Sequence, residues 1–335
     1  MESRKSGARN GQKLKILYLL QILMDYTDAT HDITLQEIID KLALYGVTAE
    51  RKSLYDDFTK LAEFGIEVEK TQYNKNAHYK ITNRKFELAE LKLLVDSVQS
   101  AKFITEEKSH ELIKKLEHLA SKYEASNLQR QVYVSGRVKS MNTDVLTNVD
   151  MIHKAIASNV MISYQYYQWN TKKEMELRRN GERYVISPWG LLWEDENYYM
   201  VGFDQSADRI KHFRVDKMLN MRMESVKREG RERFQELNMG MYAKKMFGMF
   251  DGEEQRVTLL CKNEMAGVMI DRFGKEIPML KADESHIKVI VNVALSRHFM
   301  GWLMSLSDGV RVISPEPVVF AIREEIERMK RQYDT

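Results

Sequence analysis

Apolar residues near the N-terminus recur at helical spacing, and further along the chain they alternate with polar ones. Residues 13–26 carry Ile16, Leu19, Leu20 and Leu23 at i, i+3, i+4 and i+7, which predicts an amphipathic helix. A second helix begins at Thr34, which has the spacing of a capping box with Glu37, and a third begins near Thr48 and ends at Gly65. Residues 66–82 read as two short strands around an Asn-rich turn. This order predicts a winged helix-turn-helix.

The middle of the chain returns to helical periodicity before it becomes rich in strands. Two helical pieces are expected over 86–123, a polar linker over 124–144, and a helix over about 145–158. Four or five short aromatic and β-branched strands then follow up to residue 218, which predicts a small, strongly bent sheet or barrel. Pro188 in this block predicts a bulge or an edge position.

The last part of the chain has the order strand, helix, strand, strand, helix, strand, which is the split βαβ, ferredoxin-like pattern, and a closing helix follows from Pro315. The sequence therefore predicts an α+β multidomain protein. Its expected parts are a winged helix-turn-helix domain over 1–85, a helical linker over 86–144, a strand-rich domain over 145–220, a connector over 221–254 and a C-terminal domain over 255–335. The Met-rich stretch around the connector is expected to pack hinges and interfaces.

Composition narrows the class of protein. The single cysteine, Cys261, excludes an internal disulfide framework and lies in an apolar run, where a small buried hydrophobe is expected. Gln21 and Asp25 interrupt the first apolar run, and no apolar stretch reaches the length of a membrane span. We therefore expect a cytoplasmic protein.

Enzyme and cofactor chemistry is not indicated. The chain has no GxxxxGK[ST], GxGxxG after a strand, HExxH or GxSxG, and its eight histidines are scattered. We therefore expect no enzyme, no metal and no cofactor.

The third predicted helix carries the candidate DNA contacts. Its inner face is Leu54, Phe58 and Leu61, so its outer face presents cations and hydroxyls. The candidate residues are Thr48, Arg51, Lys52, Tyr55, Thr59 and Lys60. Further phosphate contacts are expected from wing and arm cations, namely Lys70, Lys75, Lys80, Arg4, Lys5 and Arg9.

Two features of this first domain weaken the DNA-binding interpretation. Asp56 lies on the outer face, where phosphates would repel its carboxylate. Residues 1–85 carry 14 Lys and Arg against 12 Asp and Glu, which is a weak basic excess. A winged helix that contacts only protein remains the alternative.

Three blocks of sequence resemble one known family. They are "SPWGLLWEDENYYMVGFDQSADRIKHFRVDKM", "YAKKMFGMFDGEEQRVTLL" and "HFMGWLMSLSDGVRVISPEPV". The chain resembles the WYL-domain transcriptional regulators of bacteria, with a DeoR-like winged helix, a WYL domain and a WCX extension. The matching positions are Pro188, Leu191, Gly202, Arg209, Phe213, Arg214 and Asp216.

The chain departs from the family pattern at three places. The naming tripeptide Trp-Tyr-Leu is here Tyr198-Tyr199-Met200, and Lys217 stands where an arginine is usual. "YDDF" keeps Tyr55 and Asp57 but has Asp56 where the family often has arginine. The resemblance implies an SH3-like β-barrel over roughly 150–218 that senses an effector, single-stranded DNA or a nucleotide-like ligand, and it implies a homodimer.

The candidate effector residues are Tyr164, Tyr166, Tyr198, Arg209, His212 and Arg214. Arginines would contact an anion and tyrosines would stack on bases. A strand over 209–217 alternates its side chains, so Arg209 and Arg214 fall on opposite faces. The alternative is that the aromatic residues are barrel core and the cations pair with Asp208, Asp216 and nearby glutamates. Trp302 is expected in the core, and Arg297 at a helix start on the surface.

The expected function is a DNA-binding transcriptional regulator that binds an operator and senses a nucleic-acid-derived or other anionic effector. The alternative is a non-transcriptional accessory factor that binds nucleic acid or protein, for example in phage defence.

Overall fold

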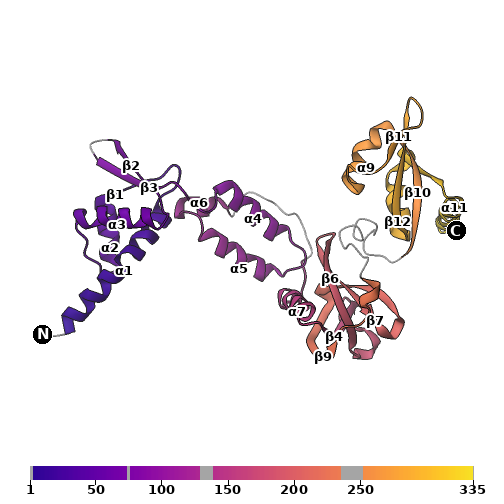
Figure 1. The fold of residues 1–335 in the computed structure, drawn as a ribbon, viewed down its shortest axis with the longest axis horizontal. Helices are drawn as coiled ribbons and strands as arrows, with labels where there is room; N and C mark the ends of the chain where they lie inside the picture. The colour runs from indigo at the N-terminus through magenta and orange to yellow at the C-terminus, as the bar shows by residue number, and fades with distance from the viewer. Residues whose placement is uncertain (1–2, 74–75, 129–138, 235–251, 335) are drawn as a thin grey trace. The chain divides into compact units, whose positions relative to one another are not determined.

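The structure is a computed structural model that describes residues 3–73, 76–128, 139–234 and 252–334. The chain forms two compact units, Met1–Lys139 and Ser140–Thr335. Figure 1 labels their elements. Within the described residues, no helix is both long and apolar enough to span a membrane.

The N-terminal unit begins with three helices and a small antiparallel sheet (Figure 1). The helices are α1 (Ser3–Tyr26), α2 (Leu35–Leu44) and α3 (Arg51–Glu63). The strands are β1 (Ile33–Thr34), β2 (Val68–Tyr73) and β3 (Asn76–Ile81), in the order β1-β3-β2. Leu19, Leu23, Ile38, Leu42 and Leu54 form the centre of their common core. The predicted helices and hairpin are confirmed, whereas β1 was not predicted because two residues carry no readable alternation.

Two helix starts show how local chemistry sets the boundaries. The predicted capping box at α2 is confirmed, since Thr34 accepts from the Glu37 amide and Glu37 accepts from the Thr34 amide. The predicted start of α3 near Thr48 is wrong by three residues, because Glu50 is the N-cap and keeps an extended backbone. Thr48 therefore lies in the turn before α3.

A separate group of helices follows. It contains α4 (Leu88–Ser100), α5 (Glu106–Glu117) and α6 (Lys122–Leu128). Helices α4 and α5 pack side by side (Figure 1) around Leu91, Val95 and Ile113. The two predicted helical pieces are confirmed, and α6 extends helical structure into the stretch predicted as a linker.

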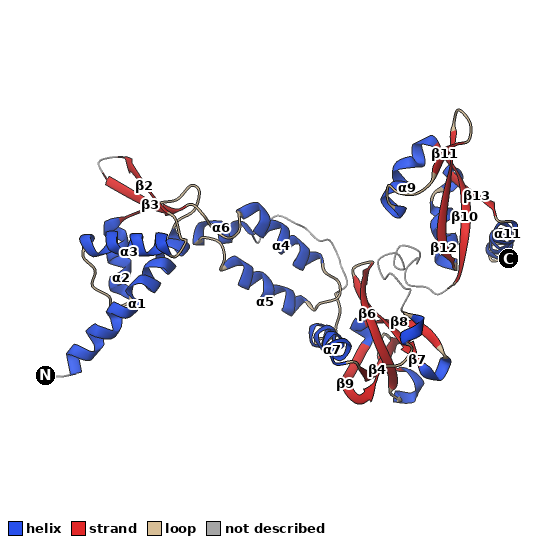
Figure 2. Ribbon diagram, viewed as in Figure 1, coloured by secondary structure: helices blue, strands red, loops and turns tan. Residues whose placement is uncertain are grey.

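The second unit begins with α7 (Val145–Ser158), which packs on a curled six-stranded sheet (Figure 2). The strands are β4 (Val160–Trp169), β5 (Met175–Leu177), β6 (Tyr184–Glu194), β7 (Asn197–Asp204), β8 (Arg209–Arg214) and β9 (Met218–Lys227). The order is β5-β4-β6-β7-β8, and β9 pairs with β4. The predicted irregularity at Pro188 is confirmed, because the β6–β7 register shifts between Pro188 and Gly190.

The end of this sheet differs from the prediction. The strand predicted to continue to residue 217 ends at Arg214, and a 3-10 turn over Val215–Lys217 leads into β9. The sequence reading missed β9 because its alternation is broken: Asn220 has a left-handed backbone and the β4–β9 register shifts. Met218 and Met221 lie in β9 and are buried, so part of the Met-rich stretch is strand. Its remainder, over 235–251, lies outside the described residues.

The C-terminal part of this unit is an antiparallel sheet covered by helices. Its strands are β10 (Glu253–Lys262), β11 (Met279–Lys281), β12 (His286–Leu295) and β13 (Val310–Ser314), in the order β11-β12-β10-β13. Its helices are α9 (Ala266–Phe273), α10 (Arg297–Ser305) and α11 (Glu316–Lys330). The predicted succession of strands and helices is confirmed. Cys261 is fully buried in this core, which confirms its interpretation as a hydrophobe, and burial raises the pKa of its thiol to about 11.

Candidate functional sites

The first candidate site is the outer face of α3. Leu54 and Leu61 are buried, and Phe58 packs partly against the same core. The opposite face is therefore turned to solvent. All six candidate residues on or before this helix are exposed, namely Thr48, Arg51, Lys52, Tyr55, Thr59 and Lys60. The helical period thus placed this face correctly.

The two adjacent aspartates of α3 have different surroundings. Asp57 forms an ion pair with Lys15 of α1, with Nζ 2.7 Å from Oδ2, and both side chains are largely buried. Lys15 also donates to Ser53 Oγ at 3.2 Å. Asp56 is exposed on the outer face. Asp57 therefore fixes α3 against α1, while Asp56 places a negative charge among the candidate cations.

The β2–β3 hairpin lies beside α3 and adds cations to the same region. Lys70 Nζ lies 5.8 Å from the centre of the Tyr55 ring. Burial and the neighbouring Tyr55 hydroxyl raise the pKa of Tyr79 on β3. Lys80 is shared between Glu69, at 3.6 Å, and the Ala29 carbonyl, at 3.5 Å.

The remaining cations predicted to contact phosphate lie outside the described residues or in a helix. Lys75 lies outside the described residues. Arg4, Lys5 and Arg9 fall within α1, whose backbone is helical from Ser3, so this segment is not an extended arm.

The aromatic residues of the curled sheet form a packed cluster. Tyr164 is 0% exposed and Tyr166 is 8% exposed. The Tyr164 and Tyr184 rings are parallel, with centroids 5.7 Å apart, and Phe213 meets Tyr164 edge-on at 5.6 Å. Tyr164 and Tyr166 therefore match the core interpretation, and neither offers a face for a stacked base in this structure.

The Tyr164 hydroxyl lies inside this cluster without a hydrogen-bond partner among the described residues. Burial raises the pKa of this phenol. An unpaired buried hydroxyl costs free energy, so the hydroxyl offsets part of the stabilisation that the buried ring provides.

Arg214 is held by a set of polar contacts at the end of β8. Its Nε and Nη2 donate to Asp216 at 3.0 and 2.9 Å, and Nη2 also donates to Asn197 Oδ1 at 2.8 Å. Its amide donates to the Tyr166 hydroxyl at 3.1 Å. Burial alone would lower the pKa of Arg214, but Asp216 outweighs it and raises the pKa. The geometry gives Arg214 a structural role and leaves its guanidinium partly exposed.

Arg209 does not join Arg214. The two residues stand at opposite ends of β8, about 17 Å apart at the usual rise of an extended strand. Strand alternation also points them to opposite faces, while His212 shares the face of Arg214. Arg209 is exposed and pairs in register with Asp204, whereas His212 is half-buried. The predicted arginine pair is therefore not one pocket.

Tyr198 lies at the β6–β7 hairpin. Its ring meets Trp193 edge-on, with centroids 4.8 Å apart, and Trp193 is 49% exposed. Trp193 was not predicted as a site residue, although its register opposite Tyr198 pairs an exposed ring with a half-buried one.

The candidate effector residues chosen from the sequence leave out three cations beside the aromatic cluster, namely Arg178, Arg179 and Lys217. Arg178 lies 6.0 Å from the Tyr166 ring centre and Arg179 lies 4.2 Å from that of Tyr184. Burial, Arg214 and Arg178 lower the pKa of Lys217, although Asp216 opposes them. Arg178, Arg214 and Lys217 thus form a cationic surface at the rim of the aromatic cluster. The "RRNG" turn that places Arg178 was the available sequence signal, because Asn-Gly marks a turn.

The remaining expectations concern metals and the C-terminal part. Among the described residues, no group of three or more His, Cys, Asp or Glu side chains is placed to hold a metal ion. Trp302 packs against the C-terminal core. Arg297 is exposed at the start of α10, 3.9 Å from Glu325.

Comparison with known families identifies two domains. Residues 147–223 match the WYL domain, and residues 253–330 match the WCX domain. These regions are the curled sheet with α7 and the C-terminal sheet with its helices. A search of curated proteins gives no significant match.

Two solved structures are similar to this chain at low identity. One is "Proteasome accessory factor B/C (PafBC) of Arthrobacter aurescens", with 17% identity over 93% of this chain and a TM-score of 0.25. This chain covers 46% of that protein's length. The other is "Crystal structure of a CRISPR Cas-related protein", with 12% identity over 100% of this chain and 87% of that one and a TM-score of 0.34.

Proposed function

We propose that this chain is a DNA-binding transcriptional regulator whose WYL domain senses an anionic effector. The observation that carries the proposal is the outer face of α3, where Arg51, Lys52, Thr59 and Lys60 are all exposed. A helix with an exposed cationic face beside a β-hairpin suits the major groove and the adjacent phosphates.

The proposed architecture gives each part a role. Helices α1–α3 with the β2–β3 hairpin act as a winged helix-turn-helix, and α3 is its recognition helix. The curled sheet acts as an SH3-like barrel, and the C-terminal sheet, with its order β11-β12-β10-β13, acts as a ferredoxin-like domain. The proposed active form is a homodimer, since one winged helix would read each half-site.

The proposed effector site is the cationic surface of Arg178, Arg214 and Lys217. Guanidinium groups bind phosphate through paired hydrogen bonds. Asp216 neutralises part of the charge of Arg214, so Arg178 and Lys217 carry the larger share of attraction for an anion. A nucleotide or short single-stranded DNA matches this charge, with the exposed Trp193 and the half-buried Tyr198 as candidate aromatic contacts.

DNA binding is tested by fluorescence anisotropy with the promoter region of the chain's own gene, over a series of salt concentrations. Replacing both Arg51 and Lys52 with Ala should weaken binding and lower the salt slope by about 0.9 for each lost phosphate contact. The matched control is Lys114→Ala with Lys115→Ala on α5, which removes the same charge from another exposed helix. Equal losses in both double variants would contradict the proposed DNA contacts.

Effector binding is tested separately with a short single-stranded oligonucleotide. Arg178→Ala and Lys217→Ala should weaken its binding while promoter binding of the free protein is kept. Native mass spectrometry of freshly purified protein would show the dimer and any co-purified oligonucleotide together.

The alternative is an accessory factor whose winged helix contacts a partner protein. The exposed Asp56 among the cations of α3 favours this alternative, because it repels phosphate. Absence of promoter binding at low salt would support the alternative over the regulator.

A further inference from the structure

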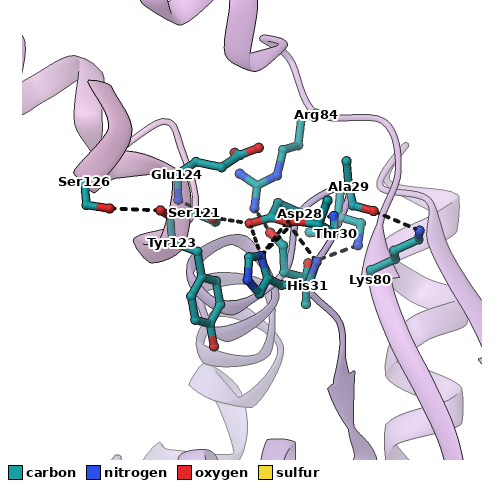
Figure 3. Close-up of polar contacts among 12 residues, drawn as sticks. Asp28, Ala29, Thr30, His31, Lys80, Arg84, Ser121, Tyr123, Glu124 and Ser126 are labelled. Atoms are coloured by element: carbon teal, nitrogen blue, oxygen red, sulfur yellow. Dashed lines mark hydrogen bonds and ion pairs between the residues drawn. The ribbon is translucent and has the colours of Figure 1, made fainter. Parts of the chain in front are cut away.

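A buried carboxylate joins the α1–α2 loop to the start of α6 (Figure 3). Asp28 is 1% exposed. Its Oδ1 accepts from the Thr30 amide at 2.8 Å and the His31 amide at 2.9 Å, and its Oδ2 accepts from Ser121 Oγ at 2.6 Å. Nδ1 of His31 lies 2.9 Å from the same carboxylate. Burial would raise the pKa of Asp28, but the hydrogen bonds from Ser121, His31 and Thr30 outweigh it and lower the pKa.

Ser121 serves two elements at once. Its hydroxyl donates to Asp28 and also accepts from the Glu124 amide at 3.1 Å, which places it as the cap of α6. The His31 ring stacks on Tyr123 of α6, with centroids 4.0 Å apart. The first turn of α6 is therefore oriented by the α1–α2 loop.

Arg84, which connects β3 to α4, contacts both sides of this junction. Its Nη2 donates to the carbonyls of Met24 and Thr27 at the end of α1. Its Nη1 lies 3.4 Å from the Leu119 carbonyl in the turn before α6. Thr27 Oγ1 in turn accepts from the Ile81 amide at 3.1 Å, so the end of the β2–β3 hairpin is tied to the same loop.

The hydrophobic packing does not continue through this junction. One core contains residues between Ile16 and Ile81, and another contains residues between Leu88 and Leu128. The two clusters share no residue among those described. A junction built from hydrogen bonds between two separate cores can open while each core stays folded, since no cavity forms in either.

We propose that Asp28, His31, Ser121 and Arg84 form a lock that fixes α4–α6 to α1–α3 and their hairpin. Closed, the lock makes α3 move with the helical segment as one body. Open, it uncouples α3 from that segment. The lock thus acts as the switchable element through which the rest of the chain controls the orientation of α3.

Pulsed electron–electron double resonance, which measures the distance between two spin labels, tests the lock directly on the full chain. Spin labels at Ala62→Cys on α3 and Lys114→Cys on α5, both exposed positions, are placed in a Cys261→Ala background. The closed lock should give one narrow distance distribution. Ser121→Ala and Asp28→Asn should each broaden it, by about twofold or more, because two bodies with separate cores become free to reorient.

The control is Thr105→Ala, which removes a comparable helix cap from α5, where Thr105 accepts from the Lys108 amide at 3.1 Å. This variant should leave the distance distribution narrow, so broadening in it would show that any cap loss has the same effect and would overturn the lock. Unchanged distributions in both Ser121→Ala and Asp28→Asn would overturn it as well. Hydrogen exchange of the amides in α2 and α4 shows whether both cores stay folded. Loss of that protection in Ser121→Ala would also overturn the proposal.

The regulatory consequence rests on the proposed function. If the chain is a regulator, Ser121→Ala should reduce the change in promoter affinity caused by a single-stranded oligonucleotide at least about tenfold. It should keep oligonucleotide binding itself. Absence of promoter binding in the wild type would sink the proposed function alone, whereas the distance distributions decide the lock independently.

Discussion

The two candidate sites contrast in what surrounds their charged and aromatic residues. On α3, the candidate side chains stand on the exposed face of one helix, and the buried face packs through Leu54 and Leu61. In the curled sheet, Tyr164 and Tyr166 are buried, and Arg214 is held by Asp216 and Asn197. The contrast teaches that the candidate residues of α3 stay exposed to solvent, whereas the buried residues of the sheet first serve the fold.

The largest expected difference between the two regions concerns their tyrosines. Tyr164→Ala should lower the free energy of unfolding by about 3–5 kcal/mol, because it removes a fully buried ring from an aromatic cluster. Tyr55→Ala on the exposed face should change it by about 0.5 kcal/mol or less. Chemical denaturation measures both values. Near-equal losses would show that the burial contrast does not hold in solution.

The two arginines of β8 should show the next largest difference in their effect on the free energy of unfolding. Arg214→Ala should destabilise the fold by about 1.5–3 kcal/mol, because it leaves the Asp216 carboxylate buried without its main donor. Arg209→Ala should be within about 0.5 kcal/mol of wild type, since Arg209 is exposed. In a double-mutant cycle, the variant with both Arg214→Ala and Asp216→Ala should lose less free energy of unfolding than the sum of the losses in the two single variants. Strict additivity would mean that the pair contributes nothing.

The adjacent aspartates of α3 test the same contrast inside one helix. Asp57→Ala should cost about 1–2 kcal/mol, because it leaves the ammonium group of Lys15 largely buried without its negative counter-charge. Asp56→Ala should leave stability unchanged and strengthen promoter binding, since it removes an exposed negative charge from the proposed DNA face. Thermal denaturation and anisotropy separate the two effects. A stability loss from Asp56→Ala equal to that from Asp57→Ala would contradict their different surroundings.

The smallest expected effect is a pH dependence in the sheet. Burial opposes ionisation of Asp204, but Lys211 and Ser206 outweigh it and lower the pKa of Asp204 from its ordinary value of 3.8. The folded state therefore holds this carboxylate ionised more strongly than the unfolded state does. Its contribution to stability is present above the unfolded pKa and is lost as the pH falls through the folded pKa. Asp204→Asn should flatten the acid side of the stability curve, whereas exposed Asp208→Asn should not.

Regular periodicity and short local motifs in the sequence predicted the elements that they mark. A strand whose backbone is irregular was missed. Helical periodicity placed the outer face of α3, the capping box at Thr34 was readable from two residues, and Pro188 marked a bulge. Strand β9 was hidden because Asn220 and two register shifts interrupt its alternation.

The cationic surface of the WYL domain was only partly predictable for a similar reason. Arg214 was found from its position in the family pattern. Arg178 comes from a 3-10 turn with a left-handed Arg179 and Asn180, and Lys217 comes from the turn after β8. Proximity between such turns is set by the curl of the sheet, and a one-dimensional pattern does not record it. The burial of Tyr164 was not predictable for the same reason, because it depends on how the aromatic side chains of several strands pack together.

The bond between Ser121 and Asp28 also has a consequence for the order of folding. The two residues are 93 positions apart, whereas each hydrophobic core beside them is built from one contiguous stretch of chain. Local cores form early, and contacts across long loops form late, because closing the loop costs entropy. The core of α1–α3 and the hairpin needs no residue beyond Ile81, so it can form before Ser121 bonds to Asp28. The junction is then assembled between two finished pieces.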